Sequence, residues 1–304
     1  MSEPARAEPK AVRDLAAALE QVYTSLPREW SAKEGAQTYP SYRFYLSVIA
    51  ACAAAIARER SSSEPLDLLD VGASLSVIGC SCRVLGMHVT DADDQHSTNH
   101  PVYQPLRQRF GVRYVDYDAL VDRLPFEDES FDIVNSNDMI EHLHGSPKRF
   151  LTESYRALRP GGRIVLTTPN LASLHNRLLL LLGRSVHHSI RDWYHGPEWL
   201  RPRYTGHVRE FTPGELRYVL REAGFVDVRV RSFNVLPGSV TAPPPDAAQL
   251  DYTRGRFSYL GKMPFHDRAF HLRSARDLAY LLVGWVTAPL PGMRRDLVAT
   301  ARKS

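Results

Sequence analysis

Hydrophobic positions follow two different patterns along the chain. In residues 14–23 and 42–60 apolar side chains recur at helical spacing, and the second segment is rich in alanine before a break of three serines. After that break, short apolar runs alternate with helical stretches. We therefore expect a helical segment over residues 1–63, followed by an α/β domain over residues 64–304.

The short apolar runs have the character of buried parallel strands, because they are nearly continuous rather than alternating. Seven such runs occur, at residues 66–72, 87–93, 112–118, 131–136, 162–169, 225–233 and 297–303. Helices fit between them, notably over residues 146–160, which end at Pro160, and 212–225, where Thr212 is the expected N-cap. The alternation predicts a doubly wound, mostly parallel sheet of seven strands.

Two long segments interrupt this alternation, at residues 171–210 and 238–290. Loops of this length in a compact domain are usually lids or binding loops, so we expect both to cover a substrate. The first is rich in histidine and aromatic residues, which suit the walls of a pocket. The residues expected to contact an acceptor are His175, Trp193, Tyr194, His207 and, from the N-terminal segment, Tyr42, for which a packing role is equally open.

Composition and charge set limits on function. The chain has 304 residues, of which 43% are hydrophobic and 24% charged, and these values are typical of a globular protein. The formal net charge is +4, which gives no reason to expect a nucleic-acid partner. In residues 191–304, 18 Lys and Arg stand against 11 Asp and Glu, so an anionic partner would meet that part of the chain.

The cysteines and the apolar runs bear on the compartment. Cys52, Cys80 and Cys82 form neither a CxxC pair nor a zinc-binding spacing, and their odd number favours a reducing environment. The first residues lack the apolar core of a signal peptide, and the longest apolar run is far shorter than a membrane span. We expect a cytoplasmic protein without a membrane span, and a homodimer is left open.

Small and acidic residues stand at the ends of the first three expected strands, where parallel sheets bind their ligands. The first strand runs into the turn Gly72-Ala73-Ser74, whose small side chains allow a ligand to approach the backbone. The second ends at Asp93, which can accept hydrogen bonds from both hydroxyls of a ribose. The third ends at Asp118, which can accept from an adenine amine. Taken singly, an acid at a strand end is more often a turn former or a helix cap.

Three stretches of the sequence are informative together: LPFEDESFDIVNSNDMIEHL at residues 124–143, ALRPGGRIVLTTPN at 157–170 and HVREFTPGELRYVLREAGF at 207–225. They resemble class I S-adenosylmethionine-dependent methyltransferases that act on small molecules. The resemblance implies a Rossmann-like methyltransferase fold with S-adenosylmethionine (SAM) as cofactor. The family's Gly-x-Gly-x-Gly is present here as Gly72-Ala73-Ser74-Leu75-Ser76, which keeps only the first glycine.

The resemblance also implies which residues bind the cofactor. They are Gly72, Ala73, Ser74, Asp93, Asp118, Ala119 and Asn137. The turn at Gly72 would face the methionine part of SAM, Asp93 the ribose and Asp118 the adenine. Asp116 is an alternative partner for the adenine, because the segment after Asp118 is longer than the family's usual spacing.

Asp138, Glu141 and His142 form a candidate catalytic group after the fourth strand. Their spacing would place all three side chains on one face if this segment is helical. His142 could then act as a general base, or the three residues could bind a divalent ion such as Mg²⁺. The spacing resembles that of ubiquinone-pathway O-methyltransferases, where it is associated with a divalent ion. A helix N-terminus without either role stays open.

These features favour one function over its alternatives. We expect SAM-dependent methyl transfer to a small acceptor that is aromatic, isoprenoid or glycosylated, with a hydroxyl favoured because His142 could remove its proton. C- or N-methylation of a similar metabolite is an alternative. An NAD-dependent oxidoreductase or epimerase is an alternative of another class, but it would need G-x-G-x-x-G after the first strand, where this chain has GASLSV. A non-catalytic SAM-binding protein is a third alternative.

Overall fold

The computed structural model describes most of the α/β domain and both N-terminal helices. The residues described are 10–26, 28–60, 64–94, 103–187, 206–234, 286–287, 290 and 292–304. Most of the second insertion, over residues 238–290, falls outside them. Trp193 and Tyr194 also lie outside the described residues, so their contact with an acceptor stays a prediction.

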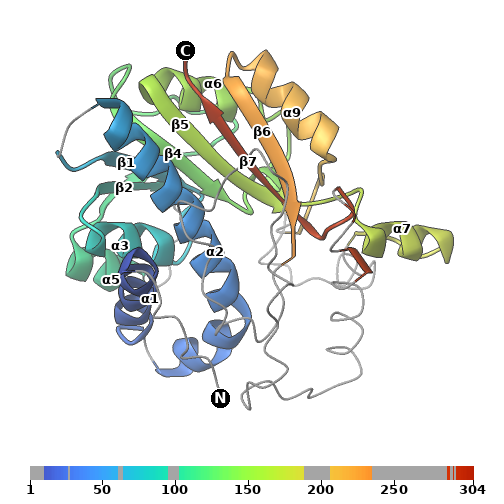
Figure 1. The fold of residues 1–304 in the computed structure, drawn as a ribbon, viewed down its shortest axis with the longest axis horizontal. Coiled ribbons are helices and arrows are strands. Elements are labelled where there is room, and N and C mark those ends of the chain that lie inside the picture. Colours follow the sequence, from blue (N-terminus) through green and yellow to red (C-terminus); the bar gives the residue numbers. More distant parts are fainter. Residues whose placement is uncertain are drawn as a thin grey trace, which may run out of the picture.

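Seven strands form one sheet, as the sequence predicts. They are β1 (Asp67–Val71), β2 (His88–Asp93), β3 (Arg113–Asp116), β4 (Phe131–Asn137), β5 (Leu158–Pro169), β6 (Val226–Phe233) and β7 (Asp296–Arg302). Their order is β3-β2-β1-β4-β5-β7-β6, and β7 runs antiparallel to both of its neighbours while the other pairs are parallel (Figure 1). The order reverses at β1, between β2 and β4, and doubly wound sheets bind their ligands beyond the strand ends at such a point.

Alternate residues of the central strands enter two separate hydrophobic cores. Leu68 of β1 and Ile133 of β4 belong to one core, and their neighbours Leu69 and Val134 belong to the other. The helices that contribute to the first core are α1 (Lys10–Tyr23), α2 (Arg28–Arg60), α3 (Val77–Val84) and α5 (Tyr103–Phe110), and those of the second are α6 (Lys148–Ala157) and α9 (Pro213–Glu222). This period of two is what a sheet covered by helices on both faces requires.

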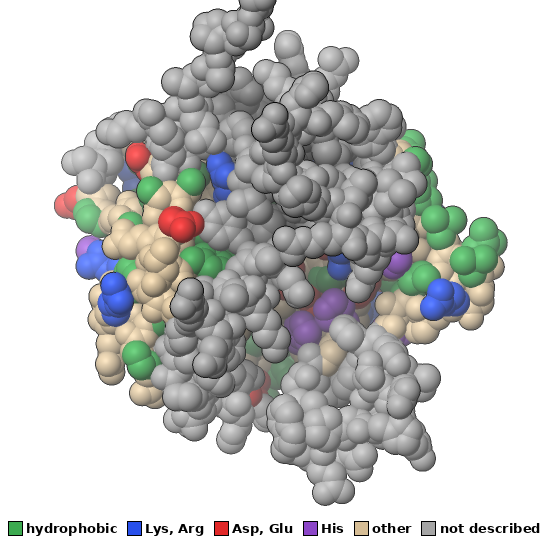
Figure 2. All heavy atoms as spheres, turned by 90° about the horizontal axis from the view of Figure 1, so that it is seen from below, with side chains coloured by type: hydrophobic (Ala, Val, Ile, Leu, Met, Phe, Trp, Pro, Cys, Tyr) green, Lys and Arg blue, Asp and Glu red, His purple; other side chains and the backbone are tan. Residues whose placement is uncertain are grey.

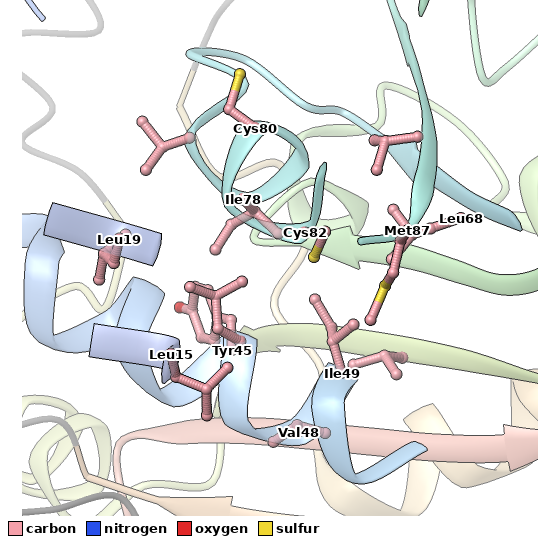
Figure 3. Close-up of a cluster of buried hydrophobic side chains, with 14 of the residues drawn as sticks. Leu15, Leu19, Tyr45, Val48, Ile49, Leu68, Ile78, Cys80, Cys82 and Met87 are labelled. Carbon is pink, nitrogen blue, oxygen red and sulfur yellow. The ribbon is translucent and has the colours of Figure 1, made fainter. Parts of the chain in front are cut away.

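The N-terminal helices pack directly on the sheet domain. Figure 3 shows Leu15 and Leu19 of α1 beside Tyr45, Val48 and Ile49 of α2, in one cluster with side chains of α3 and β1. Each buried leucine of this kind contributes about 1.5–3 kcal/mol relative to an exposed one. Helices α1 and α2 are therefore held against the sheet by the same core that holds β1.

The helix ends confirm one prediction and correct another. The Thr212 hydroxyl accepts the N–H of Glu215 at 3.2 Å, and the Glu215 carboxylate accepts the N–H of Thr212 at 2.9 Å, so α9 begins with a capping box. The helix expected to reach Pro160 ends earlier, because Leu158 already pairs with Phe131 as the first residue of β5.

The described part of the first insertion contains α7 (Leu174–Leu181), which projects from the molecule beyond the end of β5 (Figure 1). Its N-cap is Ser173, whose hydroxyl accepts the N–H of Asn176. Across the described residues, no helix combines the length and the apolar character that crossing a membrane would need.

Candidate active site

The turn after β1 takes an unusual backbone conformation at every second residue. Gly72, Ser74 and Ser76 have φ values of 73°, 45° and 59°, in the left-handed region that residues other than glycine rarely adopt. These are the three glycine positions of the family motif. The two serines therefore do not prevent the turn from forming, although each is strained by roughly 1–2 kcal/mol relative to glycine.

Arg107 of α5 links this turn to β2. Its Nε lies 2.7 Å from Oδ2 of Asp91, and both side chains are buried. Its Nη2 donates to the carbonyl oxygen of Ser74 at 3.1 Å. A buried charge is tolerated when it is paired and hydrogen-bonded, so this ion pair fixes the turn to the inner part of β2.

Asp93 lies at the end of β2, directly beside the turn. Its carboxylate accepts the N–H of Ser74 at 2.7 Å and its own neighbour's N–H, that of Asp94, at 2.8 Å. Burial raises the pKa of Asp93 to about 6, even though these two hydrogen bonds oppose the shift. Each carboxylate oxygen keeps a further lone pair, so the group suits a ligand with two adjacent hydroxyl donors.

The residues expected around the adenine are less clearly arranged for it. The Asp118 carboxylate accepts the N–H of Leu120 at 2.9 Å, so this acid has the turn-forming role that its position allows. Ala119 packs against the second core, and Asn137 accepts a hydrogen bond from the hydroxyl of Thr167 at 3.2 Å. Asp116, the other candidate, pairs with Asp93 across β3 and β2, so it lies next to the residue expected at the ribose. The choice between Asp116 and Asp118 as the partner of the adenine stays a prediction.

Asp138, Glu141 and His142 do not share a helical face, so the condition for placing their side chains on one side is not met. Only η1 (Ile140–His142), a single 3-10 turn, is helical here, and Asp138 has a φ of 49° that no helix allows. The Asp138 carboxylate accepts a hydrogen bond from the hydroxyl of Tyr45 in α2 at 2.6 Å, and it shares with Asn137 the single proton of the Thr167 hydroxyl, which lies 3.2 Å from each. Asp138 is therefore directed by α2 and β5 rather than by a helix shared with its two neighbours.

Glu141 is fully buried, which is unusual for an acid. Its Oε2 accepts the hydroxyl of Thr168 at 2.9 Å, and its Oε1 has no hydrogen-bond donor among the described residues. Burial, with the charge of Asp138 nearby, raises the pKa of Glu141 well above its usual range. Nε2 of His142 lies 4.0 Å from the free oxygen.

His207 joins this group from the far end of the first insertion. Its ring meets that of His142 edge to face, with centroids 5.0 Å apart. Its Nδ1 lies 2.9 Å from Oε1 of Glu210, whose Oε2 accepts an amide N–H of Asn176 at 3.1 Å. The backbone N–H of Val208 donates to the carbonyl oxygen of Glu141 at 2.7 Å. This hydrogen bond holds the loop at residues 206–210 against η1. Histidine side chains gather in the middle of the face shown in Figure 2.

The group able to hold a metal ion differs from the expected one. One ligand atom from each of Glu141, His142 and His207 lies within 4.8 Å of the others. Within the described chain, Asp138 is not a member of this group. His207 replaces it because the 206–210 loop folds onto η1, which the spacing in the sequence could not indicate.

Three further residues of the site escaped the sequence interpretation. Thr168 accompanies Glu141, Glu210 accompanies His207, and Asp296 begins β7 in register with Pro169. Burial raises the pKa of Asp296 to about 7 against the effect of its neighbour Arg295. One signal was available: because the last strand is antiparallel, it begins at the edge where the parallel strands end.

The other residues expected to contact an acceptor vary in their placement. Tyr42 is half-buried and packs near Tyr23 and Tyr45, with ring centroids 6.4 and 6.3 Å away. His175 is exposed in the first turn of α7, where partial burial and the charge of Arg295 lower its pKa. Of this expected set, His207 is the residue that the structure brings to the group around Glu141.

The turn after β1 lies very close to the segment that carries Glu141 and His142. A Cβ placed on Gly72 would lie 2.5 Å from Cγ of Met139, the residue before η1. The turn after β1 and the segment that carries Glu141 and His142 are therefore packed against each other, with no room for a side chain between them.

The chain matches a family model and is similar to several known proteins. A family model described as a methyltransferase domain matches residues 42–230. Ubiquinone biosynthesis O-methyltransferases of Roseobacter denitrificans and Maricaulis maris are each 29% identical, over 58% and 53% of this chain and 67% and 59% of their own lengths. This chain thus spans about two thirds of those relatives or less. A solved SAM-dependent methyltransferase from Archaeoglobus fulgidus has 17% identity and a TM-score of 0.47, covering 82% of this chain and 92% of its own.

Proposed function

Because the chain belongs to the methyltransferase domain family, as a class I SAM-dependent methyltransferase, we propose that it methylates a hydroxyl group of a small molecule. The observation that carries this proposal is the contact of Gly72, in the expected cofactor turn, with Met139 at the start of the histidine-bearing segment. A methyl donor seated at the turn would be held close to His142 and His207.

The fit of SAM rests on the carboxylate of Asp93. The ribose of SAM offers two adjacent hydroxyl donors, and Asp93 can accept both while keeping its two backbone N–H partners. When bound, SAM supplies an electrophilic methyl group on a sulfonium. Asp93→Ala should weaken SAM binding at least tenfold, since two charge-assisted hydrogen bonds contribute on the order of 2–4 kcal/mol. Asp94→Ala is the control, because it keeps the backbone N–H that donates to Asp93. Unchanged affinity in a folded Asp93→Ala protein would refute the assignment.

The proton of the acceptor hydroxyl would pass to the histidine pair. His142 is the base that the sequence favours, and it is about one third exposed, so an acceptor can reach it. His207 stands beside it with Nδ1 donating to Glu210, which leaves the lone pair of the neutral ring on Nε2. Glu210 thus orients His207 in the way that a carboxylate commonly orients a catalytic histidine.

Turnover of the variants tests this role. His142→Ala should slow methyl transfer to phenolic acceptors by roughly 10²–10⁴-fold if it is the general base, while SAM affinity stays the same. His144→Ala is the matched control, because this histidine lies two residues away and is exposed. A rate loss confined to His207→Ala would move the base to His207. Wild-type rates in the double variant would end the proposal that either histidine takes the proton.

A divalent ion is a second form of the same proposal, and the grouping of Glu141, His142 and His207 favours it. Two imidazoles and a carboxylate suit several divalent ions, and the unpaired oxygen of Glu141 is a free ligand atom. With a metal, EDTA should abolish activity and a divalent ion should restore it, and Glu141→Gln should be as damaging as His142→Ala. If EDTA has no effect, the histidines act without a metal.

The acceptor pocket is proposed to form from the N-terminal segment and the two insertions, at 171–210 and 238–290. Tyr45 supports this, because α2 delivers its hydroxyl to Asp138. Trp193→Ala or Tyr194→Ala should raise the KM for the acceptor and leave SAM binding nearly intact. An equal loss of SAM affinity would place these residues at the cofactor instead.

Other acceptors and other classes are separated by simple measurements. Transfer to nitrogen or carbon would be recognised by the position of the new methyl group in the product. Calorimetry with SAM and with NAD distinguishes a methyltransferase from an oxidoreductase or epimerase. A protein that binds SAM and methylates no acceptor in a broad panel would be a non-catalytic SAM-binding protein.

A further inference from the structure

A cleft lined by arginines lies on the sheet away from the active site. Its volume is about 400 Å³, and it is bordered by the last turns of α2 and by residues of β5, β6 and β7. Figure 1 shows that α2 and β7 end, and β5 and β6 begin, toward the same end of the molecule, whereas α7 projects from the other. We name it the arginine cleft, after Arg58, Arg163, Arg229 and Arg302.

The arginine cleft exists because small residues meet at its floor. Helix α2 presents Ala51, Cys52 and Ala55, and the strands contribute Thr300 and Ala301. Small side chains leave a hollow where larger ones would fill the space between helix and sheet.

Strand register brings the arginines of three strands to one face. Arg163 of β5 pairs with Arg302 of β7, and Arg229 of β6 pairs with Thr300. Paired residues point to the same face of a sheet, and so do residues two apart on one strand. The three guanidinium groups therefore border the same side of the sheet, the side on which α2 packs.

The charges of the arginine cleft do not balance. Four arginines line it against two acids, Glu59 and Asp227. Arg163 is paired with Glu59, and Nε of Arg302 lies 2.8 Å from Asp227, but both acids are more than half exposed. Ion pairs with exposed partners are worth little, about 0–1 kcal/mol, so a ligand with several charges can compete with them.

One donor in the arginine cleft is already without an acceptor. Nε of Arg163 is buried and makes no hydrogen bond within the described chain. Leaving a buried donor unpaired is unfavourable, and a guanidinium is shaped to bind carboxylate and phosphate oxygens through two parallel hydrogen bonds. The guanidinium of Arg163, which borders the cleft, is therefore not fully satisfied by acceptors of the described chain.

We propose that the arginine cleft binds an anionic small molecule that carries phosphate or carboxylate groups. Its volume falls within the range of roughly 300–1,000 Å³ that is usual for small-molecule sites. It is separate from the methyl-transfer site, because Arg163 is five residues along β5 from Thr168, or roughly 16 Å in an extended strand. The proposal therefore stands or fails independently of the reaction.

Calorimetry at low ionic strength tests the proposal with two probes, inorganic pyrophosphate and citrate, on the full chain. The wild type should bind at least one of them saturably, and the tighter probe identifies phosphate or carboxylate as the preferred group. Arg229→Ala should weaken that binding about tenfold or more, because a charge-assisted contact is lost. Arg302→Ala is a second variant, and SAM binding reports that each variant is folded.

The matched control is Arg113→Ala, which removes an exposed arginine from β3, the strand at the opposite edge of the sheet. Anion binding should be unchanged in it. The proposal is overturned if the wild type binds neither probe, or if Arg113→Ala lowers the affinity as much as Arg229→Ala. Binding of a single-stranded oligonucleotide more tightly than either probe, lost in the same variants, would make the cleft part of a nucleic-acid surface and would also overturn it.

Discussion

The proposed cofactor side and the proposed acceptor side of the candidate site are built by different means. The cofactor side, from Gly72 to Ser76 with Asp93, is organised by the backbone, since Ser74 contributes its N–H to Asp93 and its carbonyl to Arg107. The acceptor side, meaning Asp138, Glu141, His142 and His207, is organised by side chains from distant segments. An arrangement held by backbone atoms tolerates a change of side chain as long as the new residue accepts the required φ. An arrangement held by side chains is disturbed when any one of the contacting residues is replaced.

Electrostatics separates the two sides as well. Asp93 has a raised pKa of about 6 from burial, but it faces two backbone donors and keeps acceptor capacity for a ligand. Glu141 has a raised pKa because it is buried beside another acid, Asp138. A carboxyl between like charges favours the protonated form or a positive neighbour. The acceptor side is thus prepared for a proton or a cation, and the cofactor side for neutral donors.

The largest expected effect on stability comes from placing a side chain at the contact between the two sides. Gly72→Ala should lower the free energy of unfolding by about 3 kcal/mol, from strain at φ 73° and from the clash with Met139 at 2.5 Å. Gly86→Ala is the control, because that residue has a φ of 91° but no atom within 4 Å of the added Cβ, so only strain of about 1–2 kcal/mol applies. Urea unfolding measures both, and equal losses would show that the two sides are not in tight contact.

The next effect is a pH dependence that belongs to the cofactor side. Below pH 6 Asp93 becomes protonated and loses acceptor capacity, so SAM affinity should fall by up to tenfold per pH unit, about 1.4 kcal/mol. Affinity should level off above pH 7. Calorimetry from pH 5 to 8 measures this, with Asp93→Asn as the variant that should show no such slope.

The same titration has the opposite effect on stability, which makes the result unambiguous. The pKa of Asp93 is higher in the folded protein than in the unfolded chain, so the folded state binds more protons between about pH 4 and 6. Its contribution to stability is therefore greatest at low pH and is lost as pH rises through 6. A fall in SAM affinity on acidification cannot then be attributed to unfolding through this group.

What the sequence could predict follows the same division. The seven strands, the turn at Gly72 and the position of Asp93 follow from local patterns, and the structure confirms the strands. The joint role of Asp138, Glu141 and His142 stays a prediction, but they do not share a helical face, because Asp138 precedes η1 with a φ of 49°. The hydrogen bond of Asp138 to Tyr45 spans 93 residues of sequence, and no local pattern reports such a contact. His207 was singled out by its residue type alone, while its partner Glu210 was missed.

A smaller effect should come from the acceptor side when one of its distant partners is removed. Tyr45→Phe loses the hydrogen bond of 2.6 Å to Asp138 and keeps the ring that packs against Phe233. We expect a stability loss of about 1 kcal/mol and a higher KM for the acceptor, with SAM affinity unchanged. Tyr155→Phe is the control, because it removes a hydroxyl that bonds to Ser304 far from the site. A fall in SAM affinity in Tyr45→Phe would show that the two sides are coupled.

The smallest expected effect tests whether the cofactor side depends on its backbone alone. Ser74 has a φ of 45° and an exposed side chain, and its hydrogen bonds to Asp93 and Arg107 use only main-chain atoms. Glycine would relieve strain of roughly 1–2 kcal/mol but would add about 0.5–1 kcal/mol of conformational entropy to the unfolded chain. Ser74→Gly should therefore raise the free energy of unfolding by about 0.5 kcal/mol. Ser74→Ala, which keeps the strain, should leave it nearly unchanged. A loss of stability in Ser74→Gly, measured by urea unfolding, would mean that the serine side chain stabilises the turn after all, and that this side of the site also depends on its side chains.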